Sequence, residues 1–342
     1  MDFSSAHRLH VLDRFPAGLL TVEARELHTI LPGPTLIHLP GLRPEPIFVS
    51  ILLHGNEDTG LKAMQQVLRR HAGRMLPRAL SLFIGNIAAA RHNLRRLEDE
   101  PDYNRVWPGT KEDEHPLTEL MESVVEEMRE RRVFASIDIH NNTGLNPHYA
   151  CVNRLDQPFL HLARLFSRIV VCFEVPVGVQ SAAFAALCPA VTVECGKPGL
   201  AANADHAADF AEACLHLSHF PGHPVPKHDL DLYHTVAQVK VPDAVRFCFG
   251  DGDAELRFDA NIDALNFHDL PKGTPLARVG SQGARLEVRD TRGHDVSAAF
   301  LALEGNALKV RRAVTPAMLT QDERVIRQDC FCYFMERIPY EP

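Results

Sequence analysis

Short, continuous apolar runs recur along the first two thirds of the chain. Runs of this kind are typical of strands that are buried on both faces of a sheet. They predict strands at residues 46–57, 80–87, 133–140, 169–173 and 190–194. The first run ends in a polar turn and the third ends in a histidine, so polar chemistry is expected where these strands end.

Between these runs, apolar residues recur every three or four positions, which is the spacing of an amphipathic helix. Residues 61–68 show this pattern, and a stronger one runs from Pro116, which suits a first helical turn, to Met128. Residues 160–166 and 203–217 are also predicted to be helical. Alternating strands and helices indicate an α/β fold with a mixed, mostly parallel sheet flanked by helices.

The segment at residues 88–115 shows neither pattern. It is polar and charged, and a segment of this length without periodicity is usually a functional loop when it occurs in a compact domain. We therefore expect it to contribute to a binding site.

The pattern changes near Phe220, where PGHPVPKHD places three prolines in nine residues. Beyond it, short β-type runs alternate with turn residues, and no long helical pattern follows. A chain of 342 residues allows one large domain or two. We predict an α/β domain over residues 1–224 and a smaller, mainly β C-terminal domain over residues 225–342.

Composition narrows the classes of partner. The formal net charge of −8 leaves no basic surplus for nucleic-acid phosphates. No apolar run approaches the roughly 18 residues of a membrane span, and the N-terminal MDFSSAHRLHVLDRF lacks the apolar core of a secretion signal. We expect a cytoplasmic protein that binds neither nucleic acid nor membrane, with its eight cysteines as reduced thiols.

Candidate chemistry lies where three predicted strands end, at His54 with Glu57, at His140 and at Glu194. In open α/β sheets, ligands bind beyond the carboxyl ends of the strands, so these residues are expected to approach one crevice. Two histidines and one carboxylate form a common catalytic zinc set, which would leave Glu194 free to act as a general base. Each motif alone is more often a polar turn than a metal ligand, and only the combination favours a metal.

Four motifs occur in this order: HGNE at 54–57, NRVWPG at 104–109, DIHNNTG at 138–144 and VECG at 193–196. Together they resemble the succinylglutamate desuccinylase and aspartoacylase family of zinc carboxypeptidase-like amidohydrolases. The resemblance covers roughly residues 45–200 and implies that His54, Glu57 and His140 bind zinc, one ion per chain. It also implies that Glu194 activates water, and that the Asn104-Arg105 pair holds a substrate carboxylate, a task that suits the planar guanidinium group.

The family also has an arginine before the Asn-Arg pair, where it polarises the scissile carbonyl. The stretch RHNLRRLEDEPDYNR contains an insertion here, so Arg91, Arg95 and Arg96 compete for this role, and we select Arg96. The proline of the usual N-P-x-A motif is replaced by Ile87, and Trp107 stands where phenylalanine is common.

Two further polar residues flank His140. The resemblance favours a substrate contact for Asn141, and a role in the turn is the alternative. Asp138 lies on the same strand face as His140, where its carboxylate could accept the other ring proton of a metal-bound histidine. A plain strand-end hydrogen bond explains Asp138 equally well.

The resemblance implies an enzyme that cleaves the amide bond of a small N-acyl amino acid by metal-activated water. A small-peptide metallocarboxypeptidase is the alternative enzyme, and a non-catalytic binding homologue is the alternative outside enzymes. The retention of the ligands and of the base favours catalysis. The acyl group and the amino acid are left open, and an oligomer is compatible with the sequence.

A second group of histidines, His216, His219 and His223, is spaced by three and four residues. Two histidines on one helical turn can bind a metal, but Pro221 and Gly222 interrupt the helix before His223. We interpret the group as the polar end of a helix that enters the linker.

Overall fold

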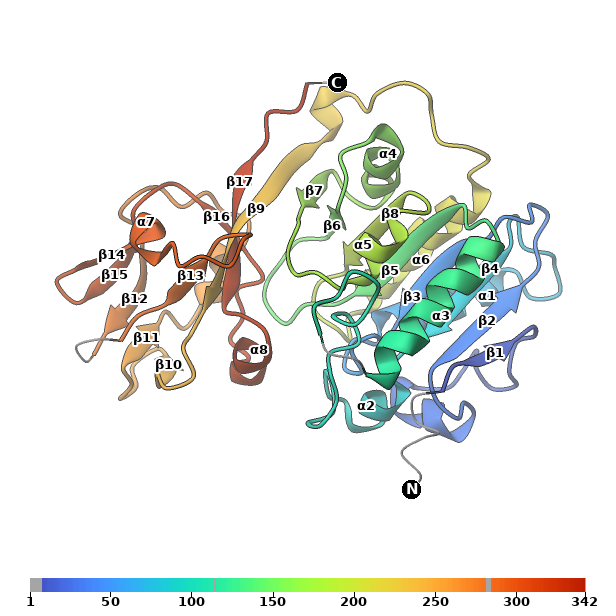
Figure 1. Cartoon of the computed structure of the whole chain (residues 1–342), viewed down its shortest axis with the longest axis horizontal. Helices are drawn as coiled ribbons and strands as arrows, with labels where there is room; N and C mark the ends of the chain where they lie inside the picture. The colour runs from blue at the N-terminus through green and yellow to red at the C-terminus, as the bar shows by residue number, and fades with distance from the viewer. Residues whose placement is uncertain (1–7, 113–114, 281–283, 342) are drawn as a thin grey trace. The chain divides into compact units, whose positions relative to one another are not determined.

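The computed structural model describes residues 8–112, 115–280 and 284–341 (Figure 1). The chain divides into two compact units. Unit 1 contains Met1–Asn141, His148–Asp231 and Tyr340–Pro342, and unit 2 contains Asn142–Pro147 and Leu232–Pro339. In the described ranges, none of the helices combines the length and the hydrophobicity needed to cross a lipid bilayer.

The sheet of unit 1 has the strand order β1-β2-β4-β3-β5-β8-β6-β7. Its central strands β4, β3, β5 and β8 are all parallel, whereas β2 pairs antiparallel with β4 and β6 pairs antiparallel with β8. The strands are β1 (His10–Leu12), β2 (Thr35–Leu39), β3 (Ile47–Ile51), β4 (Leu80–Ile84), β5 (Ala135–His140), β6 (Tyr149–Val152), β7 (Ile169–Cys172) and β8 (Ala190–Glu194). Every residue of β3, β4, β5 and β8 is buried, as their apolar runs predict.

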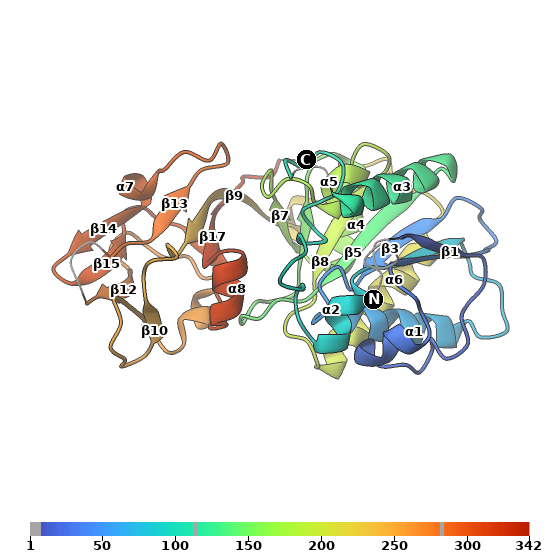
Figure 2. The same cartoon turned by 60° about the horizontal axis from the view of Figure 1, so that its bottom comes forward.

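Helices cover both faces of this sheet, and Figure 2 shows α3 and α5 on one face and α1 and α6 on the other. The helices are α1 (Thr59–Arg70), α2 (Ile87–His92), α3 (Pro116–Glu130), α4 (Gln157–Phe166), α5 (Gln180–Phe184) and α6 (Ala201–His216), with short 3₁₀ turns at η1 (Ala24–Thr29) and η2 (Lys227–Asp229). Helix α3 begins at Pro116 as predicted, with the His115 side chain accepting from the backbone N–H of Leu117. The predicted α/β fold is confirmed.

Parts of the predicted pattern differ from the structure. Helix α2 occupies the start of the segment that we expected to be a loop, because Asn86 caps it by accepting from the N–H of Ala89. Strand β3 ends at Ile51, since Leu52 has φ 54° and leaves the extended region. The sequence pattern did not predict four elements of at most five residues each, namely β1, β2, β6 and α5.

Unit 2 is built mainly from strands, as expected for a smaller β region. Strand β9 (Asp231–Lys240) pairs with β17 (Cys332–Arg337) and β13 (Glu287–Arg289), and β17 pairs with β16 (Thr315–Ala317). A second sheet has the order β10-β11-β12-β15-β14. Its strands and the remaining short helices are β10 (Phe247–Phe249), β11 (Leu256–Phe258), β12 (Pro275–Val279), β15 (Ala307–Val310), β14 (Leu301–Glu304), η3 (Ile262–Leu265), α7 (Ser297–Phe300) and α8 (Glu323–Gln328).

The core of unit 2 forms between its sheets. Phe258 of β11 stacks on Phe331, with ring centroids 4.3 Å apart, and Phe334 of β17 is fully buried beside them. The segment Asn142–Pro147 joins this unit, and a Cβ atom on Gly144 would lie 1.8 Å from the carbonyl oxygen of Leu319. Glycine is therefore required at the end of the NNTG turn by close backbone packing.

Candidate metal centre and its surroundings

The HGNE corner follows β3 after Leu52 and Leu53. The N–H of Gly55 donates to the carbonyl of Arg95 at 3.1 Å, three residues beyond the end of α2. A Cβ atom on Gly55 would lie 2.2 Å from the backbone nitrogen of Ala90, so only glycine fits. This contact and the end of β3 turn His54 and Glu57 toward the same point.

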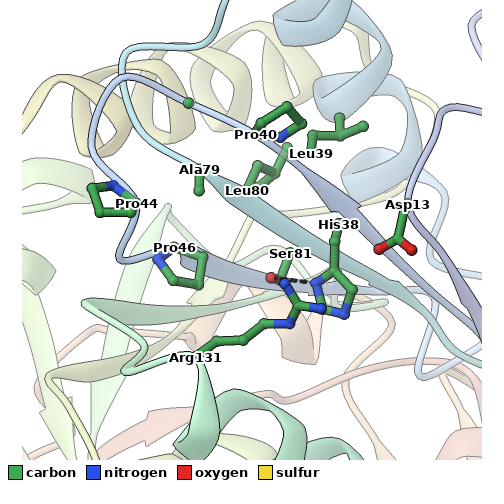
Figure 3. Close-up of a pocket in the computed structure, with 11 residues that line it drawn as sticks. Asp13, His38, Leu39, Pro40, Pro44, Pro46, Ala79, Leu80, Ser81 and Arg131 are labelled. Atoms are coloured by element: carbon green, nitrogen blue, oxygen red, sulfur yellow. Dashed lines mark hydrogen bonds between the residues drawn. The ribbon is translucent and has the colours of Figure 1, made fainter.

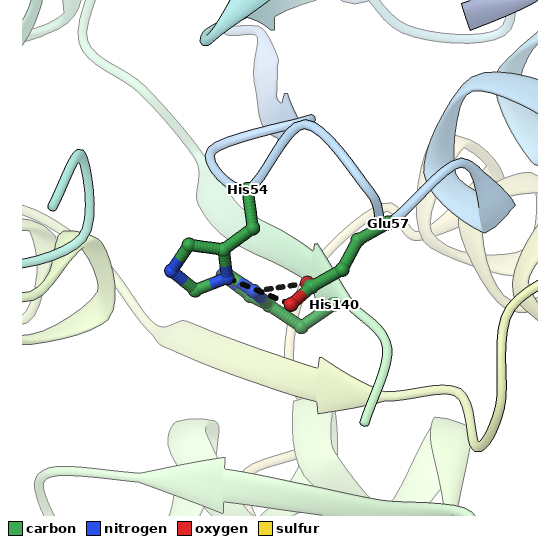
Figure 4. A group of neighbouring side chains, drawn as sticks. All are labelled: His54, Glu57 and His140. Atoms are coloured by element: carbon green, nitrogen blue, oxygen red, sulfur yellow. Dashed lines mark hydrogen bonds and ion pairs between the residues drawn. The ribbon is translucent and has the colours of Figure 1, made fainter. Parts of the chain in front are cut away.

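His54, Glu57 and His140 come together in one buried cluster (Figure 4). Glu57 lies between the two rings: its Oε1 is 2.8 Å from Nδ1 of His54, and its Oε2 is 2.8 Å from Nδ1 of His140. Burial alone would raise the pKa of Glu57, but the two histidines lower it far below its usual value. The two histidines thus favour the charged form of this carboxylate.

An aspartate lies behind each histidine. Nε2 of His54 is 3.0 Å from Oδ1 of Asp102, and Nε2 of His140 is 2.7 Å from Oδ2 of Asp138. Metal-binding histidines typically use one ring nitrogen for the ion and the other for such a partner. Both rings therefore present Nδ1 to the shared point, and the donor set fits a divalent metal of the zinc type.

Glu194 is the last residue of β8 and is buried. It is paired in register with His140 of the neighbouring parallel strand, so both side chains leave the same face of the sheet. Its charge also affects two thiols: burial, and then the Glu194 carboxylate, raise the pKa of Cys151 and Cys195 well above the usual value. Glu194 is thus a buried carboxylate beside the cluster.

Asn104 and Arg105 lie on the loop that crosses the cluster. The side-chain nitrogen of Asn104 is 3.1 Å from Nε2 of His140 and donates to Asp138 at 3.2 Å, and its oxygen accepts from the N–H of Gln180 at 2.8 Å. Arg105 donates to the carbonyl of Asn104 and contributes to lowering the pKa of Asp102. The structure therefore brings both predicted residues to the cluster.

The candidate arginines have different surroundings. Nη1 of Arg96 donates to the backbone carbonyl of Glu100 at 2.8 Å and to two others nearby in its own loop. Arg95 instead donates through Nε and Nη2 to Asp102, and its Nη1 lies 3.8 Å from Oε1 of Glu57. Of Arg95 and Arg96, Arg95 is thus the one beside the cluster.

Asn141 joins three parts of the site. Its N–H donates to Oε2 of Glu57 at 3.0 Å, its Oδ1 accepts from the N–H of Thr59, and its Nδ2 donates to the carbonyl of Gly196 at 2.8 Å. The Asn141 amide therefore ties the HGNE corner to the turn that follows Glu194.

Asp102 is the residue that sequence reasoning missed. Burial would raise the pKa of its carboxyl, but His54, Arg95 and Arg105 together lower it well below the usual value. The only signal was its place two residues before Asn104, in a loop whose folding no periodic pattern describes.

A cavity of about 400 Å³ lies where β3 and β4 begin, at the end of these strands opposite to the cluster (Figure 3). Inside it, Nδ1 of His38 is 2.8 Å from the hydroxyl of Ser81, and Arg131 reaches in from the end of α3. Burial, and then the charge of Arg131, lower the pKa of His38. The cavity is separate from the His-Glu-His cluster.

Comparisons with known proteins agree with this arrangement. Residues 47–220 match the model of the succinylglutamate desuccinylase/aspartoacylase catalytic domain. The succinylglutamate desuccinylase of Chromobacterium violaceum has a similar structure, with a TM-score of 0.55, 16% identity and 86% of each chain covered. That of Vibrio parahaemolyticus has a TM-score of 0.57 and 13% identity, over 86% of this chain and 82% of the other.

Murine aminoacylase 3 is also similar, with a TM-score of 0.51 and 16% identity, over 87% of this chain and 96% of the other. A comparison with curated protein sequences finds no match to the chain. At these identities, the solved structures establish a shared fold, and the roles of residues must be argued from the geometry above.

Proposed function

The chain belongs to the succinylglutamate desuccinylase/aspartoacylase family, and from this we propose that it is a zinc-dependent deacylase for a small N-acyl amino acid. The observation that carries the proposal is the buried cluster of His54, Glu57 and His140, with Glu194 in register beside it. Hydrolysis of an amide needs an electrophilic centre and a proton carrier at one place, which a zinc ion held by this cluster and the neighbouring Glu194 would supply.

We propose His54, Glu57 and His140 as the ligands of one zinc ion per chain. Zinc, when bound, lowers the pKa of a water molecule to about 7 and polarises a carbonyl oxygen. Asp102 and Asp138 orient the two imidazole rings from behind, and each also accepts from a second group, so that the ring positions are fixed before substrate arrives.

Glu194 is the proposed proton carrier. Its carboxylate takes a proton from the attacking water as the water oxygen forms a bond to the amide carbon. The same carboxyl group then gives this proton to the amide nitrogen as the carbon–nitrogen bond breaks, which yields a carboxylic acid and a free amine; transfer of the acid proton to the amine through solvent gives a carboxylate and an ammonium group. The register pairing of Glu194 with His140 on the neighbouring strand supports this assignment.

The arginines complete the proposed site. We now favour Arg95 over Arg96 as the group that stabilises negative charge on the carbonyl oxygen, because Arg95 lies 3.8 Å from Glu57. Arg105 is proposed to bind the substrate carboxylate, with Asn104 holding the loop beneath it. For Asn141 we propose a positioning role, because its side chain is engaged by the backbone on both sides.

Three proteins test this function: wild type, His54→Ala and Glu194→Gln, with zinc measured by elemental analysis and activity measured on N-acetyl and N-succinyl amino acids. We expect His54→Ala to lose one equivalent of zinc together with activity. Glu194→Gln should keep its zinc and lose activity by about 100-fold or more, the usual contribution of general acid–base catalysis.

A Glu194→Gln variant that stays fully active would refute the mechanism. Hydrolysis of dipeptides by wild type, without hydrolysis of N-acyl amino acids, would favour the carboxypeptidase alternative. Failure of wild type to hydrolyse either class while it still binds zinc would favour a binding protein.

A further inference from the structure

A second cluster of metal-ligating side chains lies on unit 1, outside the proposed active site. It consists of His71, Glu212 and His216, whose ligand atoms all lie within 4.8 Å of one another. Nε2 of His71 is 2.7 Å from Oε1 of Glu212, and Nε2 of His216 is 3.1 Å from the same oxygen. Two ring nitrogens from different helices thus converge on one carboxylate.

The packing of α1 against α6 fixes this convergence. Gln66 donates to Asp205 at 2.9 Å, Arg70 pairs with Asp209 at 2.9 Å, and His71 follows with Glu212. Because the residue numbers rise together along both helices, α1 and α6 run in the same direction. His71 directly follows the last turn of α1, and Glu212 and His216 stand one turn apart at the end of α6.

Two observations point to a cation at this place. The carboxyl-terminal ends of two parallel helices meet there, and each helix end carries partial negative charge that favours a cation. The second oxygen of the carboxylate, Oε2 of Glu212, is buried and has no hydrogen-bond partner. Arg70, the cationic side chain that directly precedes His71, is already paired with Asp209.

We propose that His71, Glu212 and His216 form a site for a first-row divalent transition metal such as Zn²⁺. Two imidazoles and one carboxylate are borderline ligands that suit Zn²⁺ or Co²⁺, and His216, whose side chain is 60% exposed, leaves room for water to complete the coordination. Ligands at about 2.0–2.2 Å from a tetrahedral ion stand about 3.3–3.6 Å apart. Each ring nitrogen therefore needs to move away from Oε1 of Glu212 by only a fraction of an ångström, and the three ligand atoms already lie within 4.8 Å of one another.

The neighbouring histidines have other partners. Nδ1 of His219 lies 2.9 Å from the hydroxyl of Ser218, and Nδ1 of His223 lies 3.0 Å from the carbonyl of Pro224. The proposed site therefore joins His216 to a distant helix and not to the histidines that follow it in the sequence.

A metal bound at this site would link the ends of α1 and α6. Helix α1 has 12 residues and is thus about 18 Å long, and its other end adjoins the HGNE corner. The proposed second metal site is therefore remote from the proposed catalytic residues and independent of the proposed function.

The test uses four proteins, His54→Ala, His54→Ala/His216→Ala, His54→Ala/Glu212→Gln and His54→Ala/His219→Ala, so that the proposed catalytic site is disabled in all of them. Each is freed of metal with a chelator, titrated with Zn²⁺ by calorimetry, and titrated with Co²⁺ while its visible spectrum is recorded. Circular dichroism checks that each protein is folded.

We expect His54→Ala and its His219→Ala derivative to bind one Zn²⁺ with the same affinity. Loss of His216 or of the Glu212 charge should weaken that binding at least about tenfold, since even partners outside the coordination sphere commonly contribute 10–100-fold. Equal Zn²⁺ affinity in all four proteins, or no binding by His54→Ala, would overturn the proposal. Neither result bears on the deacylase function, which is tested in the protein with an intact His54.

Discussion

Replacing Asp138 with asparagine tests whether the carboxylate behind His140 prepares that ring for metal. Asp138 is fully buried, and its Oδ2 lies 2.7 Å from Nε2 of His140 and accepts from Asn104 at 3.2 Å. Its Oδ1 accepts from the hydroxyl of Ser50 at 2.7 Å. Burial alone would lower the pKa of His140, but Asp138 and Glu57 raise it well above the usual value.

The structure allows the cost of this substitution to be estimated. An asparagine can keep its oxygen toward His140 and turn its NH₂ group to Ser50, whose hydroxyl can then donate to the carbonyl of Ile137. The substitution therefore keeps the hydrogen-bonding geometry around residue 138 and removes the negative charge of its carboxylate. Hydrogen bonds to charged groups contribute about 1 kcal/mol more than neutral ones, so the metal-free protein should be destabilised by about 1–1.5 kcal/mol. Asp138→Ala should cost about 3 kcal/mol or more, because it leaves several buried polar groups without their partner.

Metal affinity is the decisive measurement. Asp138→Asn should bind Zn²⁺ about 10–100-fold more weakly, as expected when the partner of a metal-binding histidine loses its charge. The assay is competition with a coloured chelator, performed in a His216→Ala background to exclude the second site, and urea unfolding reports stability. Ser50→Ala is the control, because it leaves the contact between Asp138 and His140 intact. Unchanged Zn²⁺ affinity in Asp138→Asn would refute the reasoning.

Three further predictions follow from other contacts. Gly55→Ala should destabilise the protein by about 1–3 kcal/mol by overpacking the backbone of α2, whereas Gly222→Ala, which meets nothing within 4 Å, should be nearly neutral in thermal unfolding. Arg95→Ala should lower kcat/KM by about 100-fold, and Arg96→Ala by no more than about twofold; the reverse order would restore Arg96 as the catalytic arginine. Burial raises the pKa of Cys214, so iodoacetamide should leave this thiol unmodified at pH 8 until denaturant is added; rapid labelling of Cys214 itself in the native protein, located by peptide mass spectrometry, would contradict the structure.

The sequence predicted β3, β4, β5, β7 and β8 of unit 1, together with the proposed ligands, for the same physical reason. A strand buried on both faces is a continuous apolar run, and the first polar residues after it lie at the carboxyl edge of the sheet. His140 ends β5 and Glu194 ends β8, so their proximity follows from the parallel pairing of two neighbouring strands. His54 and Glu57 required only that the chain turn at the end of β3.

The residues that the sequence could not place lie in loops or in long-range pairs. Asp102 and Arg95 reach the cluster through a loop without a periodic pattern, so the choice among the three arginines depended on an alignment that an insertion had disturbed. His71 and Glu212 meet only because α1 and α6 pack together, a contact between residues more than a hundred positions apart. Helix α5 has five residues and offers too little length for a helical period to be recognised.

The charge balance around the cluster of His54, Glu57 and His140 favours a divalent cation, independently of the ligand geometry. Four carboxylates gather at or beside the cluster, those of Glu57, Asp102, Asp138 and Glu194. Two guanidinium groups lie near them, those of Arg95 and Arg105, so these six described groups carry two more negative than positive charges when both imidazoles are neutral. Burial lowers the pKa of the two imidazoles, yet the surrounding carboxylates outweigh burial and raise it, which is the electrostatic sign of this excess. Because buried charge is costly unless it is paired or bound to metal, a dication at Glu57 would balance the centre and leave both imidazoles neutral, the form in which histidine is a ligand.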